Sequence, residues 1–230
     1  MKDIQHVFFD LDHTLWDFDK NSSEALHELF YELQFDREIE TIETFIQTYQ
    51  KINAKYWSLY NHGKVTKSQV RTGRFIDTLN AFQVSNAENR AHELGELYIN
   101  RSPHKTNLFP DAHETLQYLN TKYRLHIITN GFTEVQFTKL DTCGLTSYFD
   151  LILCTEEVGV NKPNPLVFET ALKRTNAQAF QSIMIGDNPE TDIQGAQNCK
   201  MHTVLFNPNR DKHSVNSIEI QGLKELQNLL

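Results

Sequence analysis

Residues 7–14 read VFFDLDHT, three consecutive apolar side chains followed by a segment with two acids, a histidine and a threonine. Four more short apolar runs occur further along the chain, at 125–128, 151–154, 183–185 and 204–206. Continuous apolar runs of this length are typical of strands that are covered on both faces. Helical patterns of crossover length separate the last four runs. The sequence therefore predicts an α/β fold with a doubly wound parallel sheet, a Rossmann-like core.

Two of the crossover helices have recognisable start signals. Thr133 and Gln136 have the spacing of a capping box, and Gly144 follows as a stop signal. Asn164-Pro165 supplies an N-cap and a first-turn proline for the next helix. We therefore expect helices to begin at these two positions.

The first connection is far longer than a crossover needs, because more than 100 residues separate the first apolar run from the second. Its pattern is helical. Helices are expected from Ser22, over 43–62, and from Thr66 with Gln69 in capping-box register. We therefore predict two domains. These are an α/β core formed by residues 1–15 and 101–230, and an all-helical cap over 16–100 that is inserted after the first strand.

The composition is that of a globular chain with a substantial core. The 230 residues are 39% hydrophobic and 23% charged, and the formal net charge of −8 disfavours a nucleic-acid polymer as partner. No apolar run approaches the length of a membrane span. The three cysteines are widely spaced, as expected for thiols in a reducing compartment. We therefore expect a cytoplasmic protein, a monomer or homodimer, that binds a small molecule and no membrane.

Each predicted strand leads into a polar segment. Ligands of open parallel sheets bind at the carboxyl ends of the strands, so these segments should meet at one edge. The residues there that carry chemistry are two pairs of acids, a hydroxyl, an amide and an amine: Asp10, Asp12, Asp187, Asp192, Thr129, Asn130 and Lys162. An Asp behind a strand is commonly a turn former, and a loop lysine is commonly solvated. Independent structural roles would not gather all of them at one edge, so we interpret the set as one site.

This set suits phosphoryl transfer. A carboxylate can act as nucleophile through an aspartyl-phosphate, and hard oxygen ligands favour Mg²⁺. Four acids and one lysine sum to about −3, which repels a phosphate dianion, and one Mg²⁺ brings the sum to about −1. Thr129, Asn130 and Lys162 are the expected phosphate-binding residues, and Thr129 and Lys162 also stabilise the charge that develops in the reaction. We therefore expect productive substrate binding to need Mg²⁺.

The motifs resemble those of the haloacid dehalogenase-like hydrolase superfamily. The four motifs are DLDHT at 10–14, ITNG at 128–131, Lys162-Pro163, and GDNPETD at 186–192. The resemblance implies that Asp10 is the nucleophile and that Asp12 is the general acid and base. It also implies a Mg²⁺ ion held by Asp10, the backbone carbonyl of Asp12 and Asp187, with Asp192 near its outer shell.

Two positions refine this resemblance. His13 stands where glycine is common in the family, so the turn after the nucleophile is expected to differ in detail. A phosphate ester expels an alkoxide that needs a proton, whereas a halide needs none, so an acid two residues after the nucleophile marks a phosphatase. Asp12 supplies this acid, which favours a phosphatase over a dehalogenase.

The resemblance further implies that the cap is a mobile lid that selects the leaving group. The window 44–76 holds six Lys and Arg residues and no acid, which fits either a solvated basic face or a lure for an anionic substrate. Trp57, Arg71 and Arg74 are the candidate substrate residues, although a residue placed like Trp57 more often packs against a neighbouring helix. The stretch 55–75 resembles the bacterial pyrimidine 5′-nucleotidases, which implies substrates such as UMP or dUMP.

Other functions are compatible with the same motifs. Related caps serve sugar phosphates and phosphoglycolate, and a phosphomutase would return the phosphate to its substrate. A phosphate-binding module without turnover is a further alternative. Asp12 argues against this last alternative, because a pure binder needs no proton donor at that position.

Overall fold

The computed structural model describes residues 3–230 and contains, within them, one six-stranded parallel sheet. Its strands are β1 (His6–Phe9), β2 (Arg124–Thr129), β3 (Phe149–Cys154), β4 (Ser182–Gly186), β5 (His202–Phe206) and β6 (Ile218–Ile220). The order β3-β2-β1-β4-β5-β6 is that of a doubly wound fold. The first five strands confirm the predicted ones. β6 was not predicted, because two of its three residues are exposed and it lacks a continuous apolar run.

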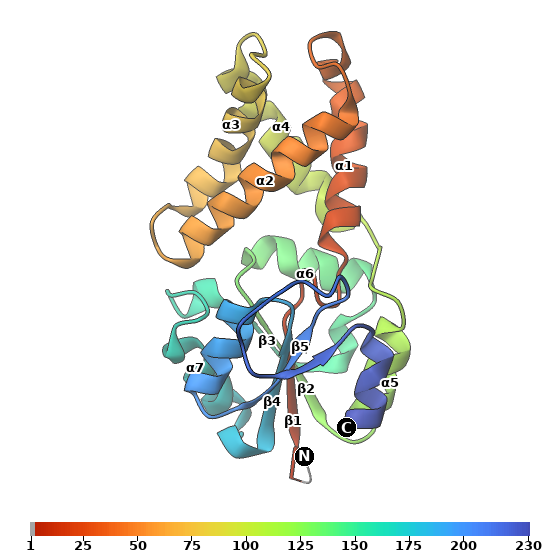
Figure 1. Cartoon of the computed structure of the whole chain (residues 1–230), viewed down its shortest axis with the longest axis vertical. Helices are drawn as coiled ribbons and strands as arrows, with labels where there is room; N and C mark the ends of the chain where they lie inside the picture. Colours follow the sequence, from red (N-terminus) through yellow and green to blue (C-terminus); the bar gives the residue numbers. More distant parts are fainter. Residues whose placement is uncertain (1–2) are drawn as a thin grey trace. The chain divides into compact units, whose positions relative to one another are not determined.

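Both faces of the sheet are covered, as the apolar runs predict. Val7 and Phe9 of β1 pack in one core cluster and Phe8 packs in another, because successive side chains of a strand point to opposite faces. The first cluster includes residues of α5 (Ala112–Asn120), α6 (Thr133–Thr142) and α9 (Leu226–Leu229), and the second includes residues of α7 (Pro165–Thr175) and α8 (Gly195–Asn198). Figure 1 shows α5 and α7 on opposite sides of the strands.

Both predicted helix starts are confirmed, since α6 begins at Thr133 and α7 begins at Pro165, but only one of the two predicted caps is present. The Asn164 side chain accepts a hydrogen bond of 3.0 Å from the N–H of Leu166, as an N-cap does. Thr133 and Gln136 form no capping box. The N–H of Thr133 instead donates to Oε2 of Glu156 at 2.8 Å, and the Gln136 side chain is fully buried. The spacing predicted a local role for Gln136, whereas the structure gives it long-range partners.

The long insertion forms four α-helices within the described residues. They are α1 (Phe18–Glu32), α2 (Ile42–Asn61), α3 (Arg74–Ala81) and α4 (Ala87–Arg101). Contacts divide the chain into two compact units, residues up to Phe18 with Thr106–Leu230, and Asp19–Lys105. The helical unit has its own core, in which Phe30, Phe45 and Phe75 are buried. The helices thus form a cap inserted after the first strand of a Rossmann-like core.

Two predicted helix starts in the cap, at Thr66 and at Ser22, can be compared with the structure. The Thr66 N–H donates to Gln69 Oε1 at 2.8 Å and the Gln69 N–H donates to Thr66 Oγ1 at 3.3 Å, which confirms that capping box. The predicted start at Ser22 is wrong, since α1 begins at Phe18 and Ser22 lies inside it. The Ser22 hydroxyl accepts a hydrogen bond from the Tyr98 hydroxyl at 2.9 Å. This serine therefore joins two helices of the cap instead of starting one.

The three cysteines are free thiols, with Cys143 and Cys154 buried and Cys199 partly exposed. None of the helices within residues 3–230 combines the length and the apolar composition that crossing a membrane requires.

Two histidines are buried side by side in the sheet. Nδ1 of His6 on β1 lies 3.0 Å from Nε2 of His126 on β2, and the rings stack with centroids 5.3 Å apart. Burial, helped by the neighbouring His6, lowers the pKa of His126 from 6.5 to about 3. Burial and the nearby Arg124 also lower the pKa of His6. The folded protein therefore favours the neutral form of both rings.

Acid should destabilise the fold through this histidine pair. Below pH 6.5 the unfolded chain takes up protons at His126 that the folded chain excludes, so the free energy of unfolding falls as the pH falls toward 3. At about pH 5 the loss from His126 is about 2 kcal/mol, since each unit below the unfolded pKa contributes about 1.4 kcal/mol. Urea unfolding at about pH 7.5 and about pH 5 measures this loss, which should be smaller in His126→Phe.

The exposed His92 on α4 provides the matched control. His92→Gln should lose as much unfolding free energy on acidification as the wild type does. An equal acid-induced loss in the wild type and in His126→Phe would contradict the assignment of this pH dependence to the buried pair.

Candidate active site

The candidate site lies at the carboxyl ends of β1 and β4, the two neighbouring strands from which the sheet continues in opposite directions. In doubly wound sheets this reversal opens the crevice that ligands occupy. Asp10 directly follows β1, and its N–H donates to the Ile185 carbonyl of β4 at 2.9 Å. Asp187 directly follows β4. The sheet pairing therefore places these two acids next to one another.

Three carboxylates gather at this edge. Asp10, Asp187 and Asp192 each offer one oxygen, and these oxygens all lie within 4.8 Å of one another. Asp192 comes from the π-helical turn Pro189–Gln194 and is buried. A Cβ atom at Gly186 would lie 2.3 Å from Asp192 Oδ2, so only glycine lets this acid approach the end of β4. Clustered carboxylate oxygens are ligands for a hard divalent cation, so this cluster could hold one.

Lys162 is the cation inside this cluster. Its ammonium donates to Asp10 Oδ1 at 2.7 Å, to Asp192 Oδ1 at 2.6 Å and to the Ile128 carbonyl at 2.8 Å, which uses all three of its hydrogens. Burial disfavours its charge, but Asp10 and Asp192 outweigh that effect and raise the pKa of Lys162 above its ordinary value. The lysine is 1% exposed. It is therefore a charged member of the site and no solvated loop residue.

The acids outnumber their cation. Burial, with repulsion from Asp192 and Asp187, raises the pKa of Asp10 well above its ordinary value although Lys162 opposes the shift. Burial and repulsion from Asp192 raise the pKa of Asp187 from 3.8 to about 8. One ammonium thus does not offset the mutual repulsion of three carboxylates. A divalent cation among them would supply the missing positive charge.

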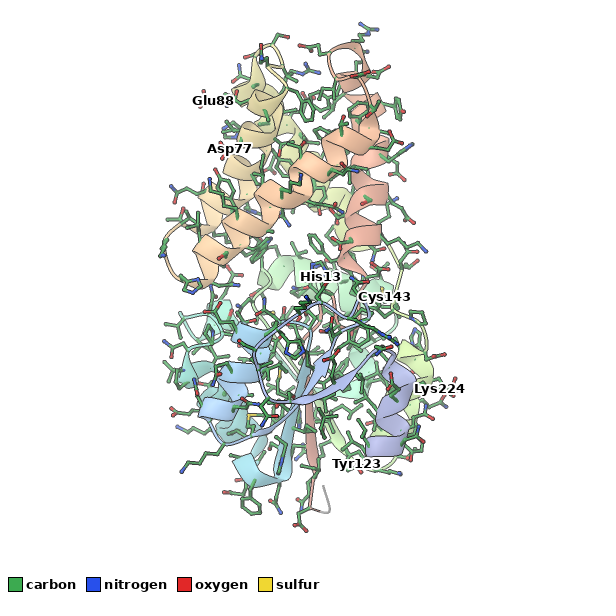
Figure 2. The ribbon with its side chains drawn as sticks, in the orientation of Figure 1. His13, Asp77, Glu88, Tyr123, Cys143 and Lys224 are labelled. Carbon is green, nitrogen blue, oxygen red and sulfur yellow. The ribbon has the colours of Figure 1, made fainter. Side chains whose placement is uncertain are left out.

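The loop after Asp10 is shaped by His13 and Thr14. His13, labelled in Figure 2, has a φ of +62°, in the left-handed region that favours glycine. Its N–H donates to the Trp16 carbonyl at 2.9 Å. The Thr14 hydroxyl donates to Asp187 Oδ1 at 3.1 Å. The turn therefore has a positive φ at position 13, where glycine is favoured. The expected difference from a glycine at this position is thus the presence of the histidine side chain.

Thr129 ends β2 with its hydroxyl oxygen accepting two hydrogen bonds. The donors are the N–H of Gly131 at 3.1 Å and Nε2 of Gln136 at 3.0 Å. A threonine hydroxyl has two lone pairs and one hydrogen, so the hydrogen remains for an acceptor such as a phosphate oxygen. This geometry fits the predicted phosphate-binding role of Thr129.

The Asn130 side chain contacts the backbone of Lys162. Its Oδ1 accepts the N–H of Lys162 at 2.9 Å, and its Nδ2 donates to the Lys162 carbonyl at 3.1 Å. The amide therefore fixes the backbone that carries Lys162. Phosphate binding by Asn130 stays a prediction.

Asp12 points away from the three-carboxylate cluster. Its Oδ2 accepts a hydrogen bond from Gln136 Nε2 at 2.7 Å and its Oδ1 contacts the Lys139 ammonium at 2.5 Å. No functional role was predicted for Gln136 or Lys139. Their spacing of three residues on one helix was the available signal, because it places both on the same face of α6.

The cap candidates lie in the helical unit. Trp57 is partly exposed on α2 with its ring 5.6 Å from that of Tyr60, and Arg71 is partly exposed in the π-helical segment Gln69–Gly73. A π-helical turn is a feature that occurs frequently at functional sites. Lys51, Lys55 and Lys64 are exposed, as a basic face or an electrostatic lure requires.

Arg74 differs from these cations because it is 4% exposed. Its guanidinium donates to Asn53 Oδ1 at 2.7 Å and lies over the ring of Phe75 at 4.9 Å from the centroid. The rings of Tyr49 and Tyr98 also lie within 6 Å of it. Arg74 is therefore part of the cap core, where it does not contribute to a solvated basic face.

The fold and the site together define an α/β enzyme with a helical cap and a carboxylate cluster at the switch point of its sheet. Residues 7–206 match the model of the haloacid dehalogenase-like hydrolases, and the chain belongs to that family. This membership confirms the resemblance drawn from the four motifs.

Three relatives extend across nearly the whole chain. Pyrimidine 5′-nucleotidase YjjG of Escherichia coli (strain K12) is 33% identical over 97% of this chain and 96% of its own length. Ribulose-1,5-bisphosphate 5-phosphatase of Halopiger xanaduensis is 32% identical over 93% of this chain and 89% of its own. The HAD-hydrolase YfnB of Bacillus subtilis, in a structure bound to magnesium, superposes with a TM-score of 0.89 at 27% identity and 98% coverage of both chains.

Proposed function

We propose that the protein is a Mg²⁺-dependent phosphomonoesterase that hydrolyses nucleoside 5′-monophosphates through an aspartyl-phosphate. The single observation that carries this proposal is the shared ammonium of Lys162, which lies 2.7 Å from Asp10 and 2.6 Å from Asp192 beside Asp187. This arrangement gives one carboxylate a fixed orientation at the switch point, together with the charges needed to receive a phosphate.

Asp10 acts as the nucleophile, and Asp12 acts as the general acid and base. An oxygen of Asp10 attacks phosphorus and forms the acyl-phosphate bond, while the bond to the ester oxygen breaks and that oxygen takes a proton from Asp12. Asp12 then accepts a proton from water as the water oxygen attacks the same phosphorus. The acyl-phosphate bond breaks, inorganic phosphate leaves and Asp10 is restored. The net reaction is ester plus water to alcohol plus phosphate.

The remaining residues hold the phosphate and the cation. The Thr129 hydroxyl hydrogen binds a phosphate oxygen, and the Lys162 ammonium, whose three hydrogens are engaged by the protein, acts on the phosphate through its charge. Asp10, Asp187 and the backbone carbonyl of Asp12 would hold Mg²⁺, with Asp192 beside it, and the oxygen-only donor set fits this ion. When bound, Mg²⁺ offsets the negative charge of the site and of the transferring phosphate. The magnesium-bound relative from B. subtilis supports this choice of ion.

The preference for nucleotides rests on the relatives and on the cap. YjjG is a pyrimidine 5′-nucleotidase by name, and the exposed lysines of α2 attract an anionic substrate. A sugar-phosphate substrate is the second candidate, because the H. xanaduensis relative is a ribulose bisphosphate phosphatase and is 32% identical.

Phosphate release from a panel of esters should separate these candidates. UMP and dUMP should give the highest kcat/KM, ahead of sugar phosphates and phosphoglycolate, and removing Mg²⁺ with a chelator should lower kcat by about 100-fold or more. Readdition of Mg²⁺ should restore the activity. Turnover that is unchanged by chelation would overturn the metal assignment. A sugar phosphate preferred by about tenfold, a difference of about 1.4 kcal/mol, would overturn the nucleotide assignment and leave the phosphatase in place.

A further inference from the structure

Asp12 is held from both sides by one helix. Lys139 Nζ lies 2.5 Å from Asp12 Oδ1, and Gln136 Nε2 donates to Asp12 Oδ2 at 2.7 Å. Gln136 and Lys139 are three residues apart on α6, so their side chains leave the same face of that helix. Each oxygen of Asp12 thus accepts one hydrogen bond and keeps a second lone pair, which is where a transferred proton can bind.

Gln136 and Lys139, the two partners of Asp12, are both buried, and burying a polar side chain is unfavourable unless it is hydrogen-bonded or paired. Gln136 is fully buried and Lys139 is 4% exposed, whereas the Asp12 side chain keeps 22% of its surface exposed. A buried ammonium is costly unless it is paired. Lys139 has Asp12 as its counter-charge and also lies 4.1 Å from the centroid of the Trp16 ring, a cation–π contact. The buried ammonium of Lys139 is therefore paired with an acid whose side chain is partly exposed.

The Gln136 side chain can reach Asp12 because position 131 is a glycine. A Cβ atom at position 131 would lie 1.5 Å from Gln136 Nε2, so any other residue there would block the amide. The same nitrogen donates to Thr129 Oγ1 at 3.0 Å. One amide thus bridges the proposed proton-transfer acid and the proposed phosphate-binding hydroxyl, and because it donates to the Thr129 oxygen it leaves the hydroxyl hydrogen for another acceptor.

We propose that Gln136 and Lys139 are positioning residues that fix the Asp12 carboxyl at the leaving oxygen, with Gln136 also orienting Thr129. This inference rests on the proposed function. Proton transfer depends strongly on placement, because a displacement of about 1 Å can cost about 100-fold in rate. Neither residue touches the substrate in this role. Both act through Asp12, and Gln136 acts through Thr129 as well.

The test compares two leaving groups under single-turnover conditions. The nucleoside leaving UMP needs a proton from Asp12, whereas 4-nitrophenolate leaving 4-nitrophenyl phosphate needs none. Lys139→Met and Gln136→Met should slow nucleoside release by about 100-fold, with the half-saturating concentration within about threefold of the wild-type value. They should slow 4-nitrophenolate release by less than about tenfold. Each variant thus gives an independent measurement of the ratio of the two losses, for UMP and for 4-nitrophenyl phosphate. The wild type must hydrolyse both esters for this comparison.

Exposed Lys173 on α7 is the matched control, and Lys173→Met should leave both rates unchanged. Thermal unfolding verifies that each variant is folded at the assay temperature. Equal losses for the two esters in both folded variants would overturn the positioning role while leaving the phosphatase intact. Failure of the wild type to release phosphate from any ester would instead overturn the proposed function.

Discussion

Asp10→Ala should lower kcat to the background rate, a loss of about 10⁴-fold or more, because the variant has no carboxylate to attack phosphorus. Two other acids near the site are held by different partners. Both oxygens of Asp192 are engaged, one by Lys162 at 2.6 Å and the other by the Asn188 N–H at 3.0 Å, and Asp12 points to α6. Phosphate release from UMP with Mg²⁺ present measures the loss.

The fold should survive this substitution. Lys162 retains Asp192 and the Ile128 carbonyl as partners, and removing Asp10 relieves part of the repulsion among the buried acids. Asp150→Ala is the matched control, since Asp150 is an exposed acid paired with Arg124 on the surface and such pairs contribute about 1 kcal/mol or less. Its activity should equal that of the wild type. A folded Asp10→Ala protein that still turns over UMP would refute the assignment of the nucleophile.

The position of the site was predictable because two general rules determine it. Short apolar runs predict buried strands, and parallel strands place the residues that follow them at one edge. Asp10, Asp187 and Lys162 are brought together in this way, although 152 residues separate Asp10 from Lys162. The order of the strands sets which ends adjoin, and the crossovers between the later runs constrain that order.

The details that the sequence did not reveal depend on the direction of individual side chains. Gln136 has the spacing of a capping residue, and its true path to Asp12 exists because Gly131 leaves room for it. Arg74 lies in a stretch of basic residues, yet it packs among aromatic rings inside the cap. Counting charges along a chain does not show which of them are buried. Ser22 likewise has the composition of a helix cap but lies within α1, where Tyr98 donates to it.

Lys162→Met should lower kcat by about 100-fold or more, because it removes the ammonium that offsets charge on Asp10 and on the transferring phosphate. It should also destabilise the fold without Mg²⁺. Asp10 and Asp192 would lose their shared cation, and removing one partner of a buried ion pair costs about 3–5 kcal/mol. Steady-state hydrolysis of UMP and urea unfolding without Mg²⁺ measure the two effects.

A double variant separates the two effects of losing Lys162. Asp192→Asn in the Lys162→Met background removes one of the two carboxylates left without a cation, so it should recover part of the lost unfolding free energy. It should not recover kcat, because the charge beside the transferring phosphate is still missing. Lys173→Met on the surface of α7 again serves as the lysine control. If the double variant regained both stability and turnover, Lys162 would be a structural cation alone, and a loss of kcat below about threefold in the single variant would lead to the same conclusion.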